Sequence, residues 1–170
     1  MVFQLDFINY LNDCLKDLEF KYYWDLSDEY SVTEALKELL EQEPRIKKLP
    51  NNIKFFKLEN GSCPVRDFIE SIQDKKLKAK VLRDIEILAA EGRKIRIPLS
   101  KYVGDGFYEL RTKQSSNVTR IFYFFVIGDL IILTNGYIKK DNKLDSRELQ
   151  KAKKYRDIYS KNYEKELNDE

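Results

Sequence analysis

Residues 107–140 read FYELRTKQSSNVTRIFYFFVIGDLIILTNGYIKK, and they hold the clearest structural pattern in the chain. Three runs within them are rich in β-branched and aromatic residues, which favour strands: 107–113, 119–127 and 130–137. Ser-Ser-Asn at 115–117 separates the first two runs, and Gly128-Asp129 separates the last two. Both separators are typical of turns, so we predict antiparallel strands joined by hairpins.

Helices are expected on both sides of these strands. Pro64 suits a first helical turn and is followed by apolar residues at helical spacing, and a second helix is predicted from about 75 to 90, with Gly92 as its stop. A short strand over 53–58 precedes this helical hairpin, and helical spacing returns from Leu149 to Tyr159. The predicted fold class is therefore α+β: an N-terminal strand, a helical hairpin, an antiparallel β-sheet and a C-terminal helix.

The first fifty residues differ from the rest. Apolar spacing over 3–19 predicts one amphipathic helix, and an aromatic group follows at 20–24. Ser31 is expected to cap a second helix that runs to about Gln42. Residues 44–52 contain two prolines and an Asn-Asn pair, which indicates a linker. We therefore predict an acidic helical N-terminal extension with a linker over residues 1–50, and a main domain over residues 51–170.

Charge divides near the same boundary. Residues 1–43 hold eleven acidic side chains and three lysines, a net charge of −8, whereas the remainder carries +10. A basic body of this kind is typical of proteins that bind polyanions. Two readings of the acidic segment stay open. It folds over the basic body as an intramolecular inhibitor, or it forms a solvated helical layer away from the functional site.

The sequence also bears on the cellular location of the protein and on its cofactors. The chain has no signal-peptide pattern, and its longest apolar run, 121–127, is too short to cross a bilayer. Cys14 and Cys63 are far apart in sequence, there is no His, and no metal-ligand spacing or Gly-rich phosphate loop occurs. We therefore expect a cytoplasmic protein with reduced thiols and with no metal, cofactor or membrane partner.

Four segments, in this order, carry a resemblance to a known family: GSCPVRDFI from Gly61, GFYELR from Gly106, RIFY from Arg120 and NGYIKK from Asn135. Over about residues 53–159 the chain resembles the HigB-like, phage-derived branch of the RelE/ParE toxin superfamily. The resemblance implies a RelE-like fold and the toxin component of a type II toxin–antitoxin system. It further implies a metal-independent endoribonuclease (mRNA interferase) that cuts mRNA on the ribosome, and a helix-turn-helix antitoxin as partner.

RNA cleavage without a metal requires cations that stabilise a pentacoordinate phosphate and groups that move protons. Because there is no His, the general base must be a Lys or Tyr with a lowered pKa, or a carboxylate. The family motifs give the predicted catalytic residues Arg111, Arg120, Asn135, Tyr137 and Lys139. Basic residues around them are the predicted RNA contacts: Lys101, Lys113, Lys140, Lys143 and Arg147.

Several of these residues have structural alternatives. Arg111 could form a surface ion pair with Glu109, and strand alternation places Tyr123 on the opposite face from Arg120, in the core. Asn135 stands where relatives commonly carry His, and it cannot titrate. Two other functions therefore stay open: a ParE-like toxin that binds a target such as gyrase without cleaving RNA, and a catalytically weakened family member.

Overall fold

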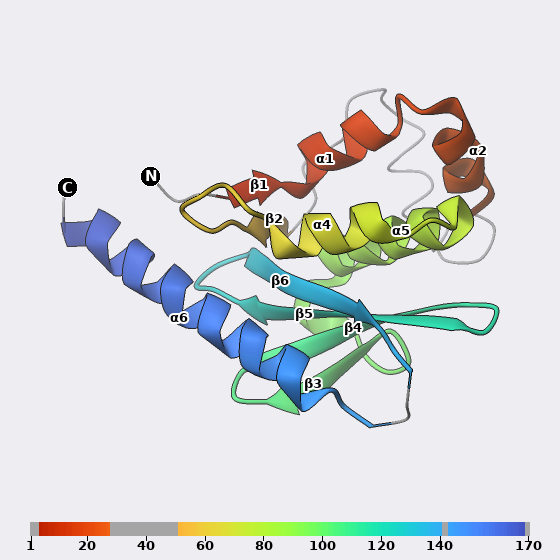
Figure 1. The fold of residues 1–170 in the computed structure, drawn as a ribbon. Coiled ribbons are helices and arrows are strands. Elements are labelled where there is room, and N and C mark those ends of the chain that lie inside the picture. Colours follow the sequence, from red (N-terminus) through yellow and green to blue (C-terminus); the bar gives the residue numbers. More distant parts are fainter. Residues whose placement is uncertain (1–3, 28–50, 141–142, 169–170) are drawn as a thin grey trace.

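The computed structural model describes residues 4–27, 51–140 and 143–168 (Figure 1). Within them the chain forms a six-stranded sheet with helices on both faces, so the α+β class is confirmed. The elements, in chain order, are β1 (Gln4–Asp6), α1 (Phe7–Cys14), α2 (Leu18–Ser27), β2 (Asn52–Phe56), α4 (Pro64–Ser71), α5 (Lys75–Glu91), the 3-10 turn η2 (Gly92–Lys94), β3 (Ser100–Gly104), β4 (Phe107–Gln114), β5 (Asn117–Phe125), β6 (Leu130–Ile138) and α6 (Ser146–Asn168).

The sheet has the strand order β1-β2-β6-β5-β4-β3. The three strands predicted from residues 107–140 are β4, β5 and β6, and they pair antiparallel through the two predicted hairpins. The sheet as a whole is mixed, because the predicted N-terminal strand, β2, joins it in parallel with β6. A parallel pair needs a long crossover, and here everything between β2 and β6 in the chain supplies it. The sequence analysis also missed β3, a five-residue edge strand.

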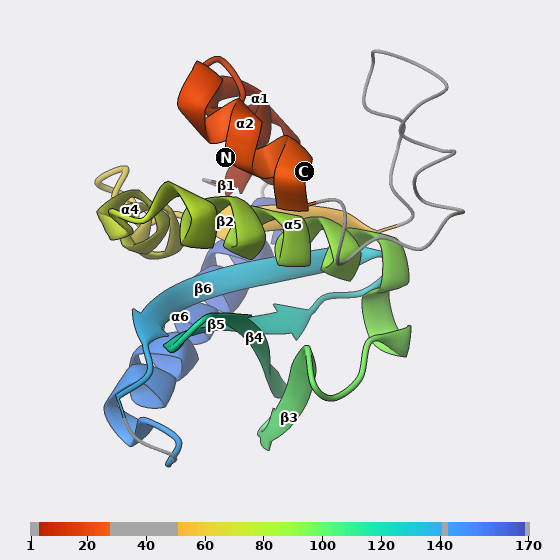
Figure 2. The ribbon, with the colours of Figure 1, turned by 90° about the vertical axis from the view of Figure 1, so that its right-hand side faces the viewer.

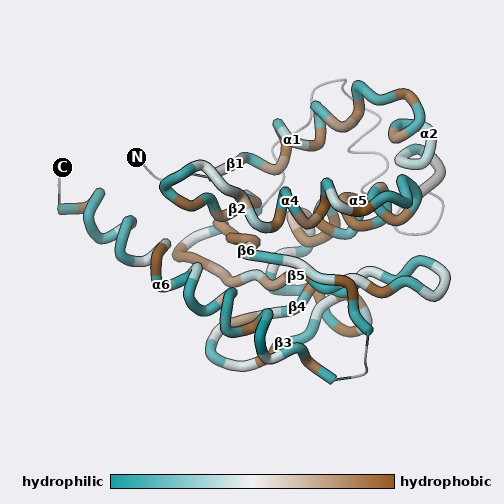
Figure 3. Tube along the Cα trace, in the orientation of Figure 1, coloured by the Kyte–Doolittle hydropathy of each residue, from teal (hydrophilic) through white to brown (hydrophobic). Residues whose placement is uncertain are grey.

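Two apolar layers hold the sheet between its helices. On one face, α4 and α5 bury side chains such as Val81 and Ile85 against Leu110, Ile121 and Leu133 of the strands. On the other face, α6 buries Leu149, Ala152 and Tyr159 against a second apolar cluster of the sheet that includes four phenylalanines, Phe56, Phe107, Phe122 and Phe124. Hydropathy follows this arrangement, since α6 is hydrophilic along most of its length and hydrophobic segments gather in the interior (Figure 3).

The predicted helical hairpin is confirmed. Pro64 occupies the first turn of α4, and the side chain of Asp74 caps α5 by accepting hydrogen bonds from the backbone N–H groups of Lys76 and Leu77. Gly92 ends α5 with φ +53°, and a Cβ at this position would meet the side chain of Asn51 at 2.5–2.7 Å. Glycine is therefore required here by packing against Asn51 as well as by the positive φ at the end of the helix.

The N-terminal segment differs from its prediction. A single helix over 3–19 is wrong, because the chain forms β1, then α1, then a break, then α2. Each helix starts at an aspartate: Asp6 accepts hydrogen bonds from two backbone N–H groups of α1, and Asp17 accepts from those of Glu19 and Phe20. These caps favour two short helices over one long one, and Leu18 is left exposed at the break.

The described part of the extension belongs to the main core. β1 pairs with β2, and α2 lies over α5 on the side away from the sheet (Figure 2). Five of its side chains belong to the same apolar cluster as the buried side chains of α4 and α5: Phe7, Tyr10, Leu11, Phe20 and Trp24. The predicted helix over 31–42 and nearly all of the predicted linker lie outside the described residues, as does the domain boundary at residue 50.

A buried ion pair marks the contact between α2 and α5. Arg83 of α5 is 1% exposed; it pairs with Glu86 at 2.7 Å and donates a hydrogen bond to the backbone oxygen of Trp24 at 3.0 Å. Its guanidinium also lies 3.7 Å from the centre of the Trp24 ring. Arg83 and Glu86 therefore lie at a helix–helix interface instead of on a solvated face.

Candidate functional site

Three predicted site residues form a row across neighbouring strands. Arg111 of β4 is the direct partner of Arg120 of β5, and Arg120 is the direct partner of Tyr137 of β6. Residues paired in this way project from the same face of a sheet, so the three side chains lie side by side. Phe122 and Phe124, two and four residues after Arg120, contact α6, which places the row on the α6 face.

A β-bulge sets the β6 end of this row. The pairing of β5 with β6 shifts between Ile121 and Tyr123, so that Thr134 and Asn135 both lie opposite Phe122. The extra residue reverses the alternation of β6 and turns Asn135 and Tyr137 toward α6. Gly136 between them has no room for a side chain, because a Cβ there would meet the Phe68 ring of α4 at 2.3 Å.

Glu109 lies between the two arginines. Its carboxylate accepts a hydrogen bond from Nε of Arg111 at 2.9 Å, and Nε of Arg120 lies 3.2 Å from the same oxygen. The predicted alternative, an ion pair between Glu109 and Arg111, is present, but Glu109 is 3% exposed and the pair is not a surface one. Sequence reasoning missed Glu109 as a part of the site, although it stands within the quoted GFYELR motif.

Arg120 is the most buried cation of the site. It is 6% exposed, and its Nε makes no hydrogen bond with any residue that the structure describes, because the contact with Glu109 is an ion pair without hydrogen-bond geometry. Burial lowers the pKa of Arg120, and the nearby charge of Glu109 opposes that shift. Since Arg remains charged in proteins, a buried and poorly paired guanidinium is suited to an incoming anion.

Two titratable side chains, Lys139 and Tyr137, lie beside the arginines. The pKa of Lys139 is lowered, first by desolvation and then by the positive charge of Arg120, so its neutral amine is easier to form than that of an ordinary lysine. The pKa of Tyr137 is raised, mainly by burial, which keeps its hydroxyl protonated. Tyr137 also stacks on Phe122, with ring centres 5.8 Å apart, and this contact fixes the ring.

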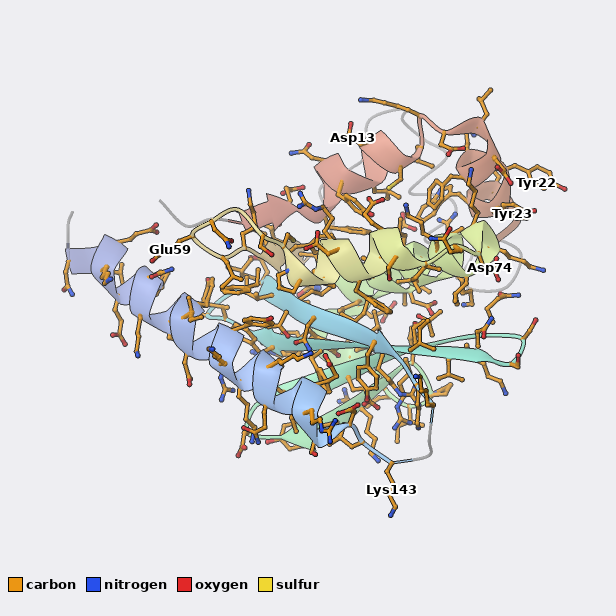
Figure 4. All side chains as sticks on the ribbon, in the orientation of Figure 1. Asp13, Tyr22, Tyr23, Glu59, Asp74 and Lys143 are labelled. Carbon is orange, nitrogen blue, oxygen red and sulfur yellow. The ribbon has the colours of Figure 1, made fainter. Side chains whose placement is uncertain are left out.

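Two adjoining surface pockets lie at the two ends of the row, one at Arg111 and one at Tyr137, and the buried Arg120 between them lines neither. One, of about 300 Å³, is lined by residues that include Lys101, Glu109, Arg111, Lys139 and Lys143. The other, of about 400 Å³, leads from Tyr137 and Lys139 to the start of α6 and includes Lys140 and Arg147. Both share Lys139, Lys143 and Leu144, so they form one basic depression. Lys143 points outward from its rim (Figure 4).

The structure does not bring every predicted residue to the depression. Lys113 has the strand parity of Arg111 but lies close to the exposed β4–β5 turn, and neither pocket includes it. Tyr123 is fully buried on the opposite face from Arg120, as predicted, and its hydroxyl bonds to that of Ser100.

Asn135 is engaged in holding α6. Its amide nitrogen donates hydrogen bonds to the backbone oxygen of Glu148 at 3.1 Å and to the Glu148 carboxylate at 3.0 Å. Its oxygen accepts from the hydroxyl of Thr134 at 2.9 Å, and the residue is 4% exposed. These contacts satisfy the side chain within the protein and connect β6 to the first turn of α6, beside the depression.

The chain belongs to a known family. Residues 67–157, more than half of the 170, match the family described as "Phage derived protein Gp49-like (DUF891)". This is a RelE/HigB-like toxin family, so membership supports a toxin-like role. The match contains Arg111, Arg120, Asn135, Tyr137 and Lys139. No curated protein sequence matches the chain.

Two general properties hold for the residues that the structure describes. None of their helices combines the length and the apolar character that a membrane crossing requires. Their His, Cys, Asp and Glu side chains form no group of three that could hold a metal ion.

Proposed function

We propose that the protein is a toxin that cleaves mRNA, with the row of Arg111, Arg120 and Tyr137 as its active site. The observation that carries the proposal is the placement of a buried, poorly paired Arg120 between Arg111 and Tyr137, beside a lysine of lowered pKa. A phosphodiester is the anion that this arrangement fits, because two guanidiniums can each donate to its oxygens.

The residues divide into three chemical roles. Arg111 and Arg120 hold the phosphate and stabilise the charge that develops on it in the transition state. The neutral amine of Lys139 takes the proton of the ribose 2′-OH, and the 2′ oxygen then forms a bond to phosphorus while the bond to the 5′ oxygen breaks. Tyr137, protonated because its pKa is raised, gives its proton to the departing 5′ oxygen. The products are a 2′,3′-cyclic phosphate and a 5′-hydroxyl.

Basic residues on the rim bind the RNA on either side of the cleaved bond. Lys101 and Lys143 line the pocket next to Arg111, and Lys140 and Arg147 line the adjoining pocket. In this proposal mRNA on the ribosome is the substrate, a helix-turn-helix antitoxin is the partner that neutralises the toxin, and the cytoplasm is the site of action. Lys113 contacts RNA only beyond the depression.

The test compares cleavage with target binding. The full chain is added to a cell-free translation reaction with a defined mRNA, and the ends of that mRNA are mapped. We expect new 5′-hydroxyl ends and no change in DNA supercoiling by gyrase. Inhibited supercoiling with intact mRNA would instead identify a ParE-like toxin, and intact mRNA with normal supercoiling would indicate the weakened family member.

The inhibitory role of residues 1–43 stays a prediction. Their described part, residues 4–27, packs on the α4 and α5 side of the sheet, whereas the candidate site lies on the α6 face. An intramolecular inhibitor would therefore have to use residues 28–43, which lie outside the described part of the chain.

A further inference from the structure

The segment between α5 and β4 forms a second basic surface. Arg93, Lys94 and Arg96 are exposed, and none of them forms an ion pair with any residue that the structure describes. Glu91 is also exposed at the end of α5 but does not pair with them. An unpaired cluster of three cations attracts polyanions more strongly than a surface where charges of both signs alternate.

This surface adjoins the candidate site through the backbone. The N–H of Arg111 donates a hydrogen bond to the backbone oxygen of Leu99 at 2.7 Å, at the end of the basic segment. The next strand, β3, pairs Lys101 with Glu109 and is an edge of the sheet. Because no strand of the described residues lies beyond β3, the surface continues from the depression around this edge.

Aromatic residues lie along this edge, and one of them, Tyr102, also lines the smaller pocket of the depression. Tyr102 is 55% exposed, and its ring packs against that of Tyr108 with centres 5.2 Å apart. Tyr108 in turn stacks on Tyr123, which fixes the group. The guanidinium of Arg93 lies 4.1 Å from the centre of the Phe125 ring. An exposed aromatic ring beside unpaired cations is the combination that binds single-stranded nucleic acid, whose bases are free to stack.

We propose that single-stranded RNA leaving the active site passes around β3, where Arg93, Lys94 and Arg96 bind its phosphates and Tyr102 stacks on a base. The inference rests on the proposed function for the nature of the ligand, and it adds a flanking-strand site to the cleavage site. The same phosphate chemistry occurs in structured ribosomal RNA, but a duplex would leave the exposed Tyr102 ring without a base to stack on.

Binding of uncleavable RNA tests the site separately from catalysis. The probes are 2′-O-methyl RNAs: a trinucleotide, which fills only the depression, and an oligonucleotide of about twelve nucleotides, which reaches around the edge. The variant is Arg93→Gln/Lys94→Gln/Arg96→Gln. The matched control is Lys76→Gln/Lys161→Gln/Lys165→Gln, which removes three exposed charges elsewhere. Fluorescence anisotropy at several salt concentrations gives the affinities.

We expect the variant to bind the longer RNA about tenfold more weakly and to lower the slope of log K against log salt by about 2, since each phosphate contact contributes about 0.7. Affinity for the trinucleotide should not change, and the control should behave like the full chain. Tyr102→Leu should weaken binding of the longer RNA by about fivefold or more, whereas Tyr102→Phe should keep the affinity.

Arg96 also donates to the backbone oxygens of Arg93 and Ile95, so its loss could disturb the segment. The double variant Arg93→Gln/Lys94→Gln keeps both hydrogen bonds of Arg96. It should lower the slope of log K against log salt by about two thirds as much as the triple variant. If the triple variant loses the same affinity for both RNAs, or if the control variant loses as much affinity for the longer RNA, the flanking site is overturned.

A chain that binds the longer RNA through these residues but does not cut mRNA would overturn the cleavage proposal alone. Loss of affinity for an isolated ribosomal RNA duplex, with unchanged affinity for the longer single strand, would show that the cations bind ribosomal RNA and would overturn the single-strand proposal. A full chain that binds neither RNA overturns both.

Discussion

Arg111 and Arg120 face each other directly across β4 and β5, and both direct Nε at one oxygen of Glu109, at 2.9 and 3.2 Å. One buried carboxylate thus offsets part of the repulsion between two guanidiniums. The Nε atoms are used for this contact, so the outer nitrogens remain for a ligand. The pair keeps a net positive charge, which a phosphodiester would complement.

Replacement of Arg120 by Ala should remove most activity. We expect RNA cleavage to fall by about a hundredfold or more, since a transition-state charge loses a preorganised donor. Because Arg120 is buried beside Glu109, a modest loss of thermal stability is also expected, and circular dichroism will measure it. The exposed Arg66, which pairs with Asp67, offers the control Arg66→Ala. Full toxicity of Arg120→Ala in cells would exclude the assigned site.

Glu109→Gln should separate binding from cleavage. The amide keeps the size of the carboxylate but removes its charge, so the site becomes more positive while the arginines lose their shared anchor. We expect RNA affinity to hold or rise and the single-turnover cleavage rate to fall by about tenfold or more, because positioning is lost. Both quantities are measured on the same variant. A lower RNA affinity with an unchanged cleavage rate would show that Glu109 does not position the arginines.

Lys139 should give cleavage a distinctive pH dependence. Burial and the charge of Arg120 lower its pKa, so the neutral amine accumulates at a lower pH than it does for an ordinary lysine. The single-turnover rate should therefore rise with pH and level off below the usual range of lysine titration. Lys139→Arg should be slow and lack this rise, because arginine does not lose its proton. If the single-turnover rates of the full chain and of Lys139→Arg depend on pH in the same way, Lys139 is not the base.

Asn135→Ala should loosen the start of α6. The change removes two hydrogen bonds to Glu148 and leaves the Thr134 hydroxyl without one of its acceptors. We expect a loss of about 1–3 kcal/mol in the free energy of unfolding, measured by urea denaturation. Hydrogen exchange should increase first around residues 146–149. An unchanged midpoint, combined with a large loss of cleavage, would show that Asn135 acts on the RNA instead.

Deletion of residues 1–50 should destabilise the whole protein. The described part of this segment supplies β1 and five core side chains, and at about 2 kcal/mol for each side chain their burial is comparable to the stability of an average domain. We expect the truncated chain to aggregate or to unfold at a much lower temperature in size-exclusion and melting experiments. A truncated protein with the original melting temperature would show that the extension is a separate unit.

The sequence allowed more of the fold to be predicted than of the site geometry. Hairpin strands and the helix pair follow from local patterns, and alternation along one strand places Tyr123 on the opposite face from Arg120. The pairing of Arg111 with Arg120 depends on the hairpin register, which alternation does not give. The bulge at Thr134 and Asn135 leaves no sequence signal, although it decides where Tyr137 points. The parallel pairing of β2 with β6 depends on distant segments, so local periodicity could not indicate it.

Burial explains the remaining differences. Glu109 looks like a surface partner because charged residues are mostly exposed, yet tertiary packing covers it. Arg83 and Glu86 look like the solvated face of a helix, but α2 covers them. The break between α1 and α2 depends on the cap at Asp17, which competes with an apolar spacing that would otherwise continue.

Mapping of mRNA ends in a cell-free translation reaction tests the cleavage proposal most directly. The full chain and the Arg120→Ala variant are added at equal concentration, and the chemistry of each new end is determined. The proposed mechanism predicts 2′,3′-cyclic phosphate and 5′-hydroxyl ends with the full chain and almost none with Arg120→Ala. Intact mRNA with the full chain, or the same cleavage by both proteins, would contradict it.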